Sequence, residues 1–157
     1  MENVIETNRL AKRYGPVIAL DDVNVSVRRG DIYGLVGDNG AGKTTLFKIL
    51  CGLAFPTGGE MRLLGAHLPR ELERQRARVG AIIEQPGFYP GLSVEENLEC
   101  CRIQKGVPGR KATGRLLEEV DLAYAKDRAC KGLSMGMRQR LGLAMALIGE
   151  PELLVLD

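Results

Sequence analysis

The sequence feature that most constrains this chain is the eight-residue string GDNGAGKT, residues 37–44. It matches the pattern GxxxxGK[ST] at all four fixed positions. An apolar run, 32–36, precedes it, and the stretch 44–51 after it has apolar residues at Leu46, Ile49 and Leu50, which is the spacing of one helical face. We therefore predict a strand buried on both faces, then a glycine-rich loop, then a helix that ends before Gly52.

This context gives the string a specific chemistry, that of a phosphate-binding loop. Glycines let the backbone curl so that successive N–H groups point at phosphate oxygens, and the helix N-terminus adds its positive end. Lys43 supplies a point charge to the β- and γ-phosphates, and the Thr44 hydroxyl is a ligand for Mg²⁺. The predicted nucleotide-binding residues are Gly37, Asp38, Asn39, Gly40, Ala41, Gly42, Lys43, Thr44 and Thr45.

A second metal ligand is predicted at the end of another apolar run, 153–156. The run has the form of a buried strand, and Asp157 follows it directly. A phosphate-binding loop needs a carboxylate for Mg²⁺ at the end of a neighbouring strand. Asp157 therefore joins Thr44 as a predicted magnesium ligand.

Composition excludes several other classes of protein. The 157 residues carry 22 Lys+Arg against 20 Asp+Glu, only 4% are aromatic and none is Trp, so neither a basic surface nor a base-stacking platform for nucleic acid is expected. The longest apolar or glycine run, 141–149, is too short to cross a bilayer, and the first residues do not form a secretory signal. Four cysteines without CxxC spacing and the single His67 make a zinc site improbable, and we expect buried, reduced thiols in a cytosolic protein.

The rest of the chain reads as strands followed by helices. Ser93 and Glu96 form a capping-box pattern, and Ser134 is placed to cap the last helix. Strands are predicted at 23–27, 61–64, 79–83 and 153–156, a solvated helix at 70–78, and further helices at 94–101, around Leu116, Leu117 and Val120, and at 135–148. This order indicates an α/β layer fold with a helical insertion.

The string Leu133-Ser134-Met135-Gly136-Met137, followed by Gln139-Arg140, adds a further motif before the last strand. Together with the phosphate loop and Asp157, it resembles the ATP-binding subunit of ABC transporters, and the likeness covers essentially all 157 residues. The resemblance implies a P-loop NTPase layer fold with an N-terminal antiparallel β portion and a helical insertion subdomain. It divides the single domain 1–157 into an ATP-binding core at 1–85, a helical subdomain at 86–135, and a signature helix with the Walker B strand at 136–157.

The resemblance also implies roles for individual residues. In the family the signature LSGGQ reaches across a dimer to the γ-phosphate of ATP, a role that Ser134 and the Gly136 N–H would take here, although Met135 and Met137 depart from the pattern. Tyr14 is similar in position to an aromatic residue that stacks on adenine. The family's Q-loop glutamine, a Mg²⁺ or water contact in the coupling loop, corresponds either to Glu84, which counting favours, or to Gln85.

Glu84, the string Phe88-Tyr89-Pro90 and the signature together resemble the bacitracin and lantibiotic type of drug-export ATPase. This implies ATP and Mg²⁺ as cofactors, a transmembrane permease as partner, a homodimer or heterodimer of ATP-binding subunits, and a cytoplasmic position at the inner face of the membrane. A non-transport ABC protein and a binding-only fragment are the alternatives. A P-loop GTPase or kinase is disfavoured because no Asn-Lys-x-Asp string occurs and the signature would be unexplained.

The resemblance also indicates which catalytic residues this chain should contain. In the family the catalytic glutamate follows the position of Asp157, and a dimer-contacting loop and a switch histidine come later, so His67 lies too early and is expected in a surface loop. We therefore expect a chain truncated at Walker B, with little ATP turnover of its own.

Overall fold

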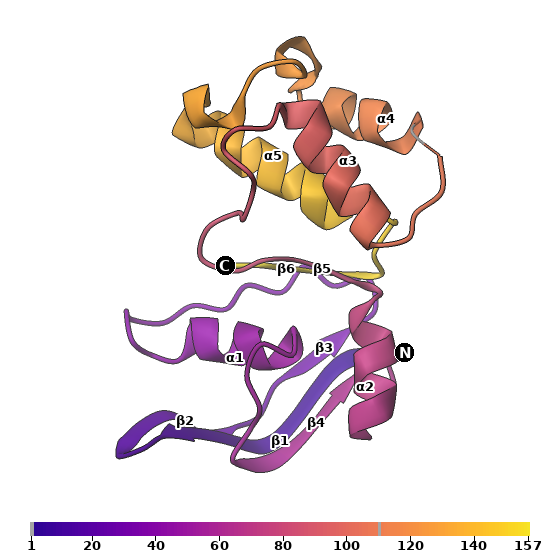
Figure 1. Cartoon of the computed structure of the whole chain (residues 1–157). Coiled ribbons are helices and arrows are strands. Elements are labelled where there is room, and N and C mark those ends of the chain that lie inside the picture. The colour runs from indigo at the N-terminus through magenta and orange to yellow at the C-terminus, as the bar shows by residue number, and fades with distance from the viewer. Residues whose placement is uncertain (1, 110) are drawn as a thin grey trace. The chain divides into compact units, whose positions relative to one another are not determined.

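The computed structural model describes residues 2–109 and 111–157 (Figure 1). Contacts between Cα atoms divide the chain into two units. The first comprises the residues through Ala77 together with Asp157, and the second comprises Arg78–Leu156. Each unit has its own sheet and its own helices.

The first unit is built on an antiparallel sheet whose central strand is β1 (Asn3–Tyr14). It pairs with β2 (Val17–Val23), β3 (Ser26–Arg28) and β4 (Gly58–Leu63). The antiparallel portion predicted at the N-terminus is thus confirmed.

The single strand predicted at 23–27 is wrong, since β2 ends at Val23 and β3 begins at Ser26. The extended strand is interrupted there because Asp22 has φ +50° and the Asn24 side chain accepts a hydrogen bond from the Arg9 N–H, at 2.8 Å. A side chain that bonds the backbone in this way replaces a ladder bond.

Two helices complete this unit. Helix α1 (Lys43–Leu50) buries Leu46, Ile49 and Leu50, as their spacing predicted. Helix α2 (Pro69–Arg76) has no buried residue and is the solvated helix that its mixed charges predicted. Arg76 nevertheless has a structural role, because its guanidinium donates to the carbonyl oxygens of Ile49 and Leu50 at 3.3 Å and so satisfies the C-terminal end of α1.

The buried strand predicted at 32–36 is not formed. Residues 31–38 have no strand assignment, and Ile32 and Val36 are 104% and 96% exposed. A strand of this type exists only when neighbouring strands take up its N–H and C=O groups and other elements cover its faces. In the part of the chain that the structure describes, no strand pairs with this run, so its apolar composition alone does not make it a strand.

The second unit contains a parallel pair of strands and a group of helices. Strand β5 (Val79–Ile82) pairs with β6 (Leu153–Leu156) in register, with Val79 opposite Leu153. The helices are α3 (Val94–Gln104), α4 (Lys111–Glu119) and α5 (Met135–Leu147), with short 3₁₀ segments at Ala123–Ala125 and Cys130–Gly132. Both predicted caps are present: Ser93 and Glu96 form a full capping box on α3, and the Ser134 hydroxyl accepts from the Met137 N–H on α5.

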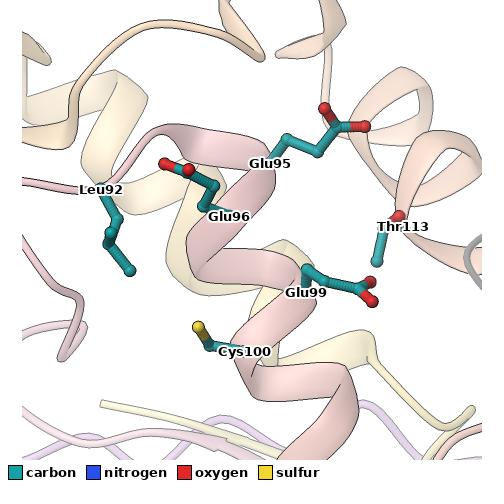
Figure 2. A pocket seen from close by; sticks show the side chains of 6 residues that line it. All are labelled: Leu92, Glu95, Glu96, Glu99, Cys100 and Thr113. Atoms are coloured by element: carbon teal, nitrogen blue, oxygen red, sulfur yellow. The ribbon is translucent and has the colours of Figure 1, made fainter.

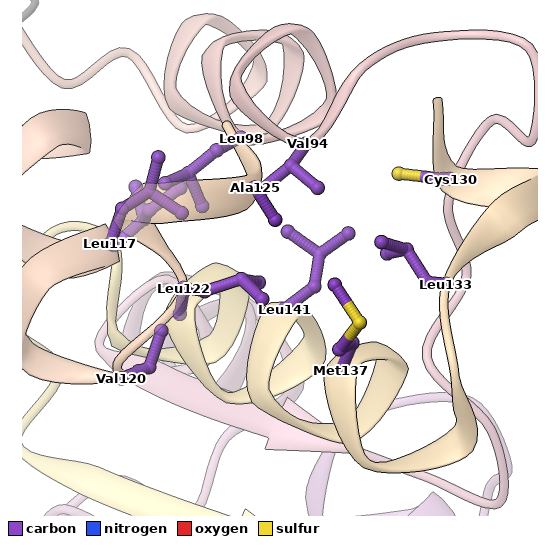
Figure 3. Close-up of a cluster of buried hydrophobic side chains, with 12 residues drawn as sticks. Val94, Leu98, Leu117, Val120, Leu122, Ala125, Cys130, Leu133, Met137 and Leu141 are labelled. Carbon is purple, nitrogen blue, oxygen red and sulfur yellow. The ribbon is translucent and has the colours of Figure 1, made fainter. Parts of the chain in front are cut away.

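The core of this unit lies between its three helices (Figure 3). Val94 and Leu98 of α3 meet Leu117 of α4, and all three are almost wholly buried. From α5 the residues at i, i+4 and i+7 enter the same core, namely Met137, Leu141 and Ala144. This spacing places them on one face of the helix. Leu133, which precedes the Ser134 cap in an extended conformation, packs into the same core.

Two further expectations concern the whole of the described chain. Among the residues that the structure describes, no helix is both long and apolar enough to cross a membrane. All four cysteines are free thiols, of which Cys130 is buried while Cys51, Cys100 and Cys101 are half-buried. The prediction of buried thiols is therefore right for one cysteine and too strong for three.

Candidate nucleotide site

The phosphate loop, residues 37–44, takes a conformation that requires glycine at two positions. Gly42 caps α1 with φ +87°, and Gly40 has φ +86°. A Cβ at Gly42 would lie 2.3 Å from the Ala19 carbonyl oxygen, so the start of α1 sits directly against β2. The left-handed angle and the close approach together explain why a side chain is excluded at Gly42.

Lys43 folds its side chain back over this loop. Its Nζ donates to the carbonyl oxygens of Gly37 at 2.7 Å and Asp38 at 2.8 Å. An ammonium group has three donors. Two of them position the charge above the loop, and one is left to reach a phosphate oxygen.

Thr44 and Asp157 lie 113 positions apart in sequence, yet they are in contact within the first unit. The Thr44 hydroxyl donates to Oδ2 of Asp157 at 2.7 Å. A hydroxyl and a carboxylate are hard oxygen donors of the kind that Mg²⁺ accepts alongside phosphate oxygens and water. The pair therefore fits the magnesium ion that the sequence implied.

The remaining predicted nucleotide residues all belong to the first unit. The Tyr14 ring is 48% exposed at the end of β1, and Lys12 Nζ lies 4.7 Å from its centroid, a cation–π arrangement. Thr45 is half-buried in the first turn of α1. Asp38, Asn39 and Ala41 are exposed, and the Ala41 N–H donates to the Asp38 carbonyl at 3.1 Å, which closes the turn of the loop.

The second unit carries the segment 133–137 at the start of α5. Ser134, Met135 and Gly136 are exposed, whereas Leu133 and Met137 are buried in the core. The Met137 side chain is only 8% exposed, so it packs inward and does not face a ligand. The i, i+4 and i+7 spacing of Met137, Leu141 and Ala144 is the sequence signal that could have predicted this.

The loop that follows β5 contains a strained residue. Glu84 has φ +62°, a left-handed angle that is uncommon for residues other than glycine. Such angles cost of order 1–3 kcal/mol and gather at functional sites. The side chains of both Glu84 and Gln85 are exposed, so both remain candidates for the predicted contact in this loop.

Comparison with known proteins identifies the family of this chain. A family model described as ABC transporter matches residues 20–157. The chain belongs to the ABC transporter family. Its fold agrees with this. A solved structure of a dimeric ATP-binding cassette, in a post-hydrolysis state with ADP and Pi bound, superposes with a TM-score of 0.86 at 26% sequence identity. The match covers 98% of this chain and 73% of the solved chain. The predicted P-loop NTPase layer fold is thus confirmed.

Curated relatives of this ABC chain include transport ATP-binding proteins. A bacitracin transport ATP-binding protein of Enterococcus faecalis is 45% identical over 157 residues, which are 100% of this chain and 51% of that protein. A lantibiotic transport ATP-binding protein of Streptococcus pyogenes is 38% identical over 154 residues, 98% of this chain and 66% of that protein. The bacitracin relative is therefore about twice as long as this chain, which spans only about half of it.

In this ABC chain two cavities of the second unit flank helix α3. One, of about 400 Å³, is lined by Leu92, Glu95, Glu96, Glu99, Cys100 and Thr113 (Figure 2). Two of its three carboxylates have partners within the chain, because Glu96 closes the capping box and Glu99 accepts from Arg102 at 2.7 and 2.8 Å. The two hydrogen bonds from Ser93 lower the pKa of Glu96, which keeps this cap ionised.

The other cavity, of about 310 Å³, is lined by Gly87, Phe88, Tyr89, Asn97, Cys100, Cys101, Gln104 and Met145. It contains a residue that the sequence analysis missed, Asn97, which is 1% exposed and hydrogen-bonded on both sides of its amide. No motif marks it. The only available signal was a polar residue on the apolar face of α3, between Val94 and Leu98.

Proposed function

We propose that this chain is the ATP-binding part of an ABC export ATPase that acts with a separate transmembrane permease. The observation that carries the proposal is the arrangement of Lys43, Thr44 and Asp157, which gathers a cation and two hard oxygen donors at the N-terminus of α1. These groups suit the triphosphate and Mg²⁺ of ATP.

In this proposal each residue at the centre has one task. The N–H groups of the phosphate loop and the Lys43 ammonium bind the phosphates, and Thr44 and Asp157 hold Mg²⁺. The ion neutralises charge on the β- and γ-phosphates. Tyr14 offers a half-exposed ring for adenine, and the loop after β5 offers the side chain of either Glu84 or Gln85 as a further oxygen ligand.

A second copy of such a subunit would complete the site from the signature side. Ser134 is exposed, and its oxygen accepts the cap bond from the Met137 N–H, which leaves the hydroxyl hydrogen free to donate to a γ-phosphate. The exposed Gly136 would add its backbone N–H. The related cassette was solved as a dimer, which supports this arrangement for either a homodimer or a heterodimer.

Export as the direction of transport is supported by a relative named as a Nod factor export ATP-binding protein, beside the relatives named for bacitracin and lantibiotic transport. Hydrolysis and transport are proposed for the whole protein to which these residues belong. We also propose the division into an ATP-binding core (1–85), a helical subdomain (86–135) and a signature helix with Walker B strand (136–157). The protein would lie at the cytoplasmic face of the membrane, held there by the permease.

Calorimetric titration of Mg·ATP into the chain tests the proposal. Lys43→Ala should weaken binding about 10- to 150-fold, since losing a charged hydrogen bond to phosphate costs about 1.5–3 kcal/mol. Lys111→Ala is the matched control, because it removes the same charge from an exposed position on α4. Equal affinity of the wild type and Lys43→Ala for Mg·ATP would show that Lys43 does not contribute to phosphate binding. If the wild type did not bind Mg·ATP, the proposal would be refuted.

A further inference from the structure

Asn97 makes five hydrogen bonds through one buried side-chain amide in the second unit. It lies one turn into α3, it is 1% exposed, and it bonds the loop that leads from Glu84 to α3. The Tyr89 N–H donates to Asn97 Oδ1 at 2.6 Å, and Asn97 Nδ2 donates back to the Tyr89 carbonyl at 3.0 Å. One side chain thus satisfies both backbone groups of Tyr89.

These partners also determine which way the amide faces. An N–H group at 2.6 Å requires an oxygen opposite it, because two donors would repel. The NH₂ group then faces four acceptors: the carbonyl oxygens of Ser93 at 2.9 Å, Tyr89 at 3.0 Å and Leu92 at 3.4 Å, and Cys130 Sγ at 3.2 Å. A carboxylate in this position would place negative charge against all four.

The contact with Cys130 connects this loop to the residues just before the signature. Backbone hydrogen bonds join the same two stretches, from the Cys130 N–H to the Leu92 carbonyl and from the Lys131 N–H to the Pro90 carbonyl, both at 2.9 Å. Three residues after Cys130, Leu133 enters the core that Cys130 and Val94 also line (Figure 3). The signature therefore begins on a segment that is bonded to the loop.

The beginning of the loop also contacts the signature helix. A Cβ at Gly142 of α5 would lie 2.5 Å from Cγ of Pro86, so Pro86 packs against the backbone of α5 itself. The loop is thus fixed at Pro86 by α5 and at Tyr89 by Asn97. The Tyr89 ring remains 56% exposed while its backbone is fixed.

We propose that Asn97 is a positioning residue that joins the coupling loop (residues 84–90) to the signature segment (residues 133–137), so that a displacement of one is passed to the other. This rests on the proposed function, in which a permease acts on the coupling loop and the signature acts on ATP. Asn97 touches neither partner. Its buried amide reinforces the backbone hydrogen bonds that join the same two stretches of chain.

The first measurement is hydrogen exchange on the whole chain, which requires neither ATP nor a permease. Asn97→Asp replaces the donating NH₂ by a carboxylate of the same size, and the amides of Cys130 and Lys131 should then exchange at least tenfold faster. Gln104→Glu is the matched control, because it makes the same chemical change at an exposed position on α3 that lines the same cavity. Unchanged exchange at 130 and 131 in Asn97→Asp would overturn the proposal.

The second measurement is ATP turnover of the full-length subunit, alone and assembled with its permease. Asn97→Asp should keep the kcat and KM of the free subunit within twofold and lose at least fivefold of the stimulation by the permease, while Gln104→Glu retains it. Cys130→Ala removes the Asn97 contact on the signature side, together with the core packing of one sulfur atom, and should lose part of the stimulation. It serves in place of Asn97→Asp if that variant does not fold.

The outcomes separate this inference from the proposed function. Full stimulation in Asn97→Asp and Cys130→Ala would refute the role of Asn97, and so would an equal loss of free and stimulated turnover, which indicates a merely structural residue. Absence of ATP turnover in the wild-type subunit would refute the proposed function instead, and the exchange measurement would still decide whether Asn97 joins the two segments.

Discussion

Replacing Gly42 with alanine tests whether the phosphate loop depends on the close approach of α1 to β2. Two costs follow from the structure. At φ +87° an L-residue is in the left-handed region, which costs about 1–2 kcal/mol. The new Cβ would also lie 2.3 Å from the Ala19 carbonyl oxygen and 2.6 Å from Cδ2 of Leu20, and overpacking of this kind costs about 1–3 kcal/mol.

We therefore expect Gly42→Ala to lower the free energy of unfolding by about 2–5 kcal/mol, a large part of the 5–15 kcal/mol typical of a domain. Urea unfolding followed by far-UV circular dichroism gives this as a shift of the midpoint at constant slope. Hydrogen exchange adds a local measurement, since amides of α1 such as the Leu46 N–H, bonded to the Gly42 carbonyl at 2.9 Å, should lose protection.

Gly40→Ala is a control matched in backbone angle. Gly40 has φ +86°, but no atom lies within 4 Å of its Cβ position, so this variant carries the strain without the overlap. It should lose only about 1–2 kcal/mol. Equal losses in the two variants would refute the argument from close approach, and a loss below about 0.5 kcal/mol in Gly42→Ala would refute the argument as a whole.

Three further predictions address the second unit. Leu141→Ala should lower the free energy of unfolding by about 2–5 kcal/mol, measured in urea, because Leu141 is 0% exposed in the core. Because the Ser93 bonds lower the Glu96 pKa, this cap stabilises the fold above about pH 4.5, the ordinary value for glutamate, and the stabilisation is lost as the pH falls through the lowered pKa. Urea midpoints between pH 7 and 3 should show this loss, and Glu96→Gln should flatten it while Glu95→Gln does not. In the subunit assembled with its permease, Glu84→Gln should retain more transport than Glu84→Ala because the amide keeps a ligand oxygen; equal loss would indicate a role for the charge, and no loss in either would assign the position to Gln85.

The elements that the sequence predicted well are those determined by neighbouring residues. The apolar spacing of α1, the capping box of Ser93 and Glu96, and the Ser134 cap on α5 are all present, because each depends on residues within about one helical turn. Strand predictions succeeded for β5 and β6, which pair with each other, and failed at 32–36, where no described strand pairs, and at 23–27, where Asp22 and Asn24 interrupt the run. Apolar composition permits a strand, but only a partner makes one.

The site was predictable only in part for the same reason. The glycines, Lys43 and Thr44 were predicted together because one local string contains them. That Met137 faces the core was predictable from its spacing to Leu141 and Ala144, at i+4 and i+7 of the same helix. Asn97 had no motif, since its importance lies in bonds to Tyr89 and Cys130, 8 and 33 positions away.

The sequence by itself therefore determined the chemistry of this protein: a loop that can bind phosphate, an acidic residue after an apolar run, and a capped helix that carries a signature. These are properties of short strings, in which bond geometry and side-chain type suffice. Only the tertiary structure decided that the Thr44 hydroxyl lies 2.7 Å from Asp157, that Gly42 has no room for a methyl group, and that Asn97 bonds two segments at once. Such contacts form between residues distant in sequence, and their distances depend on the packing of the whole unit.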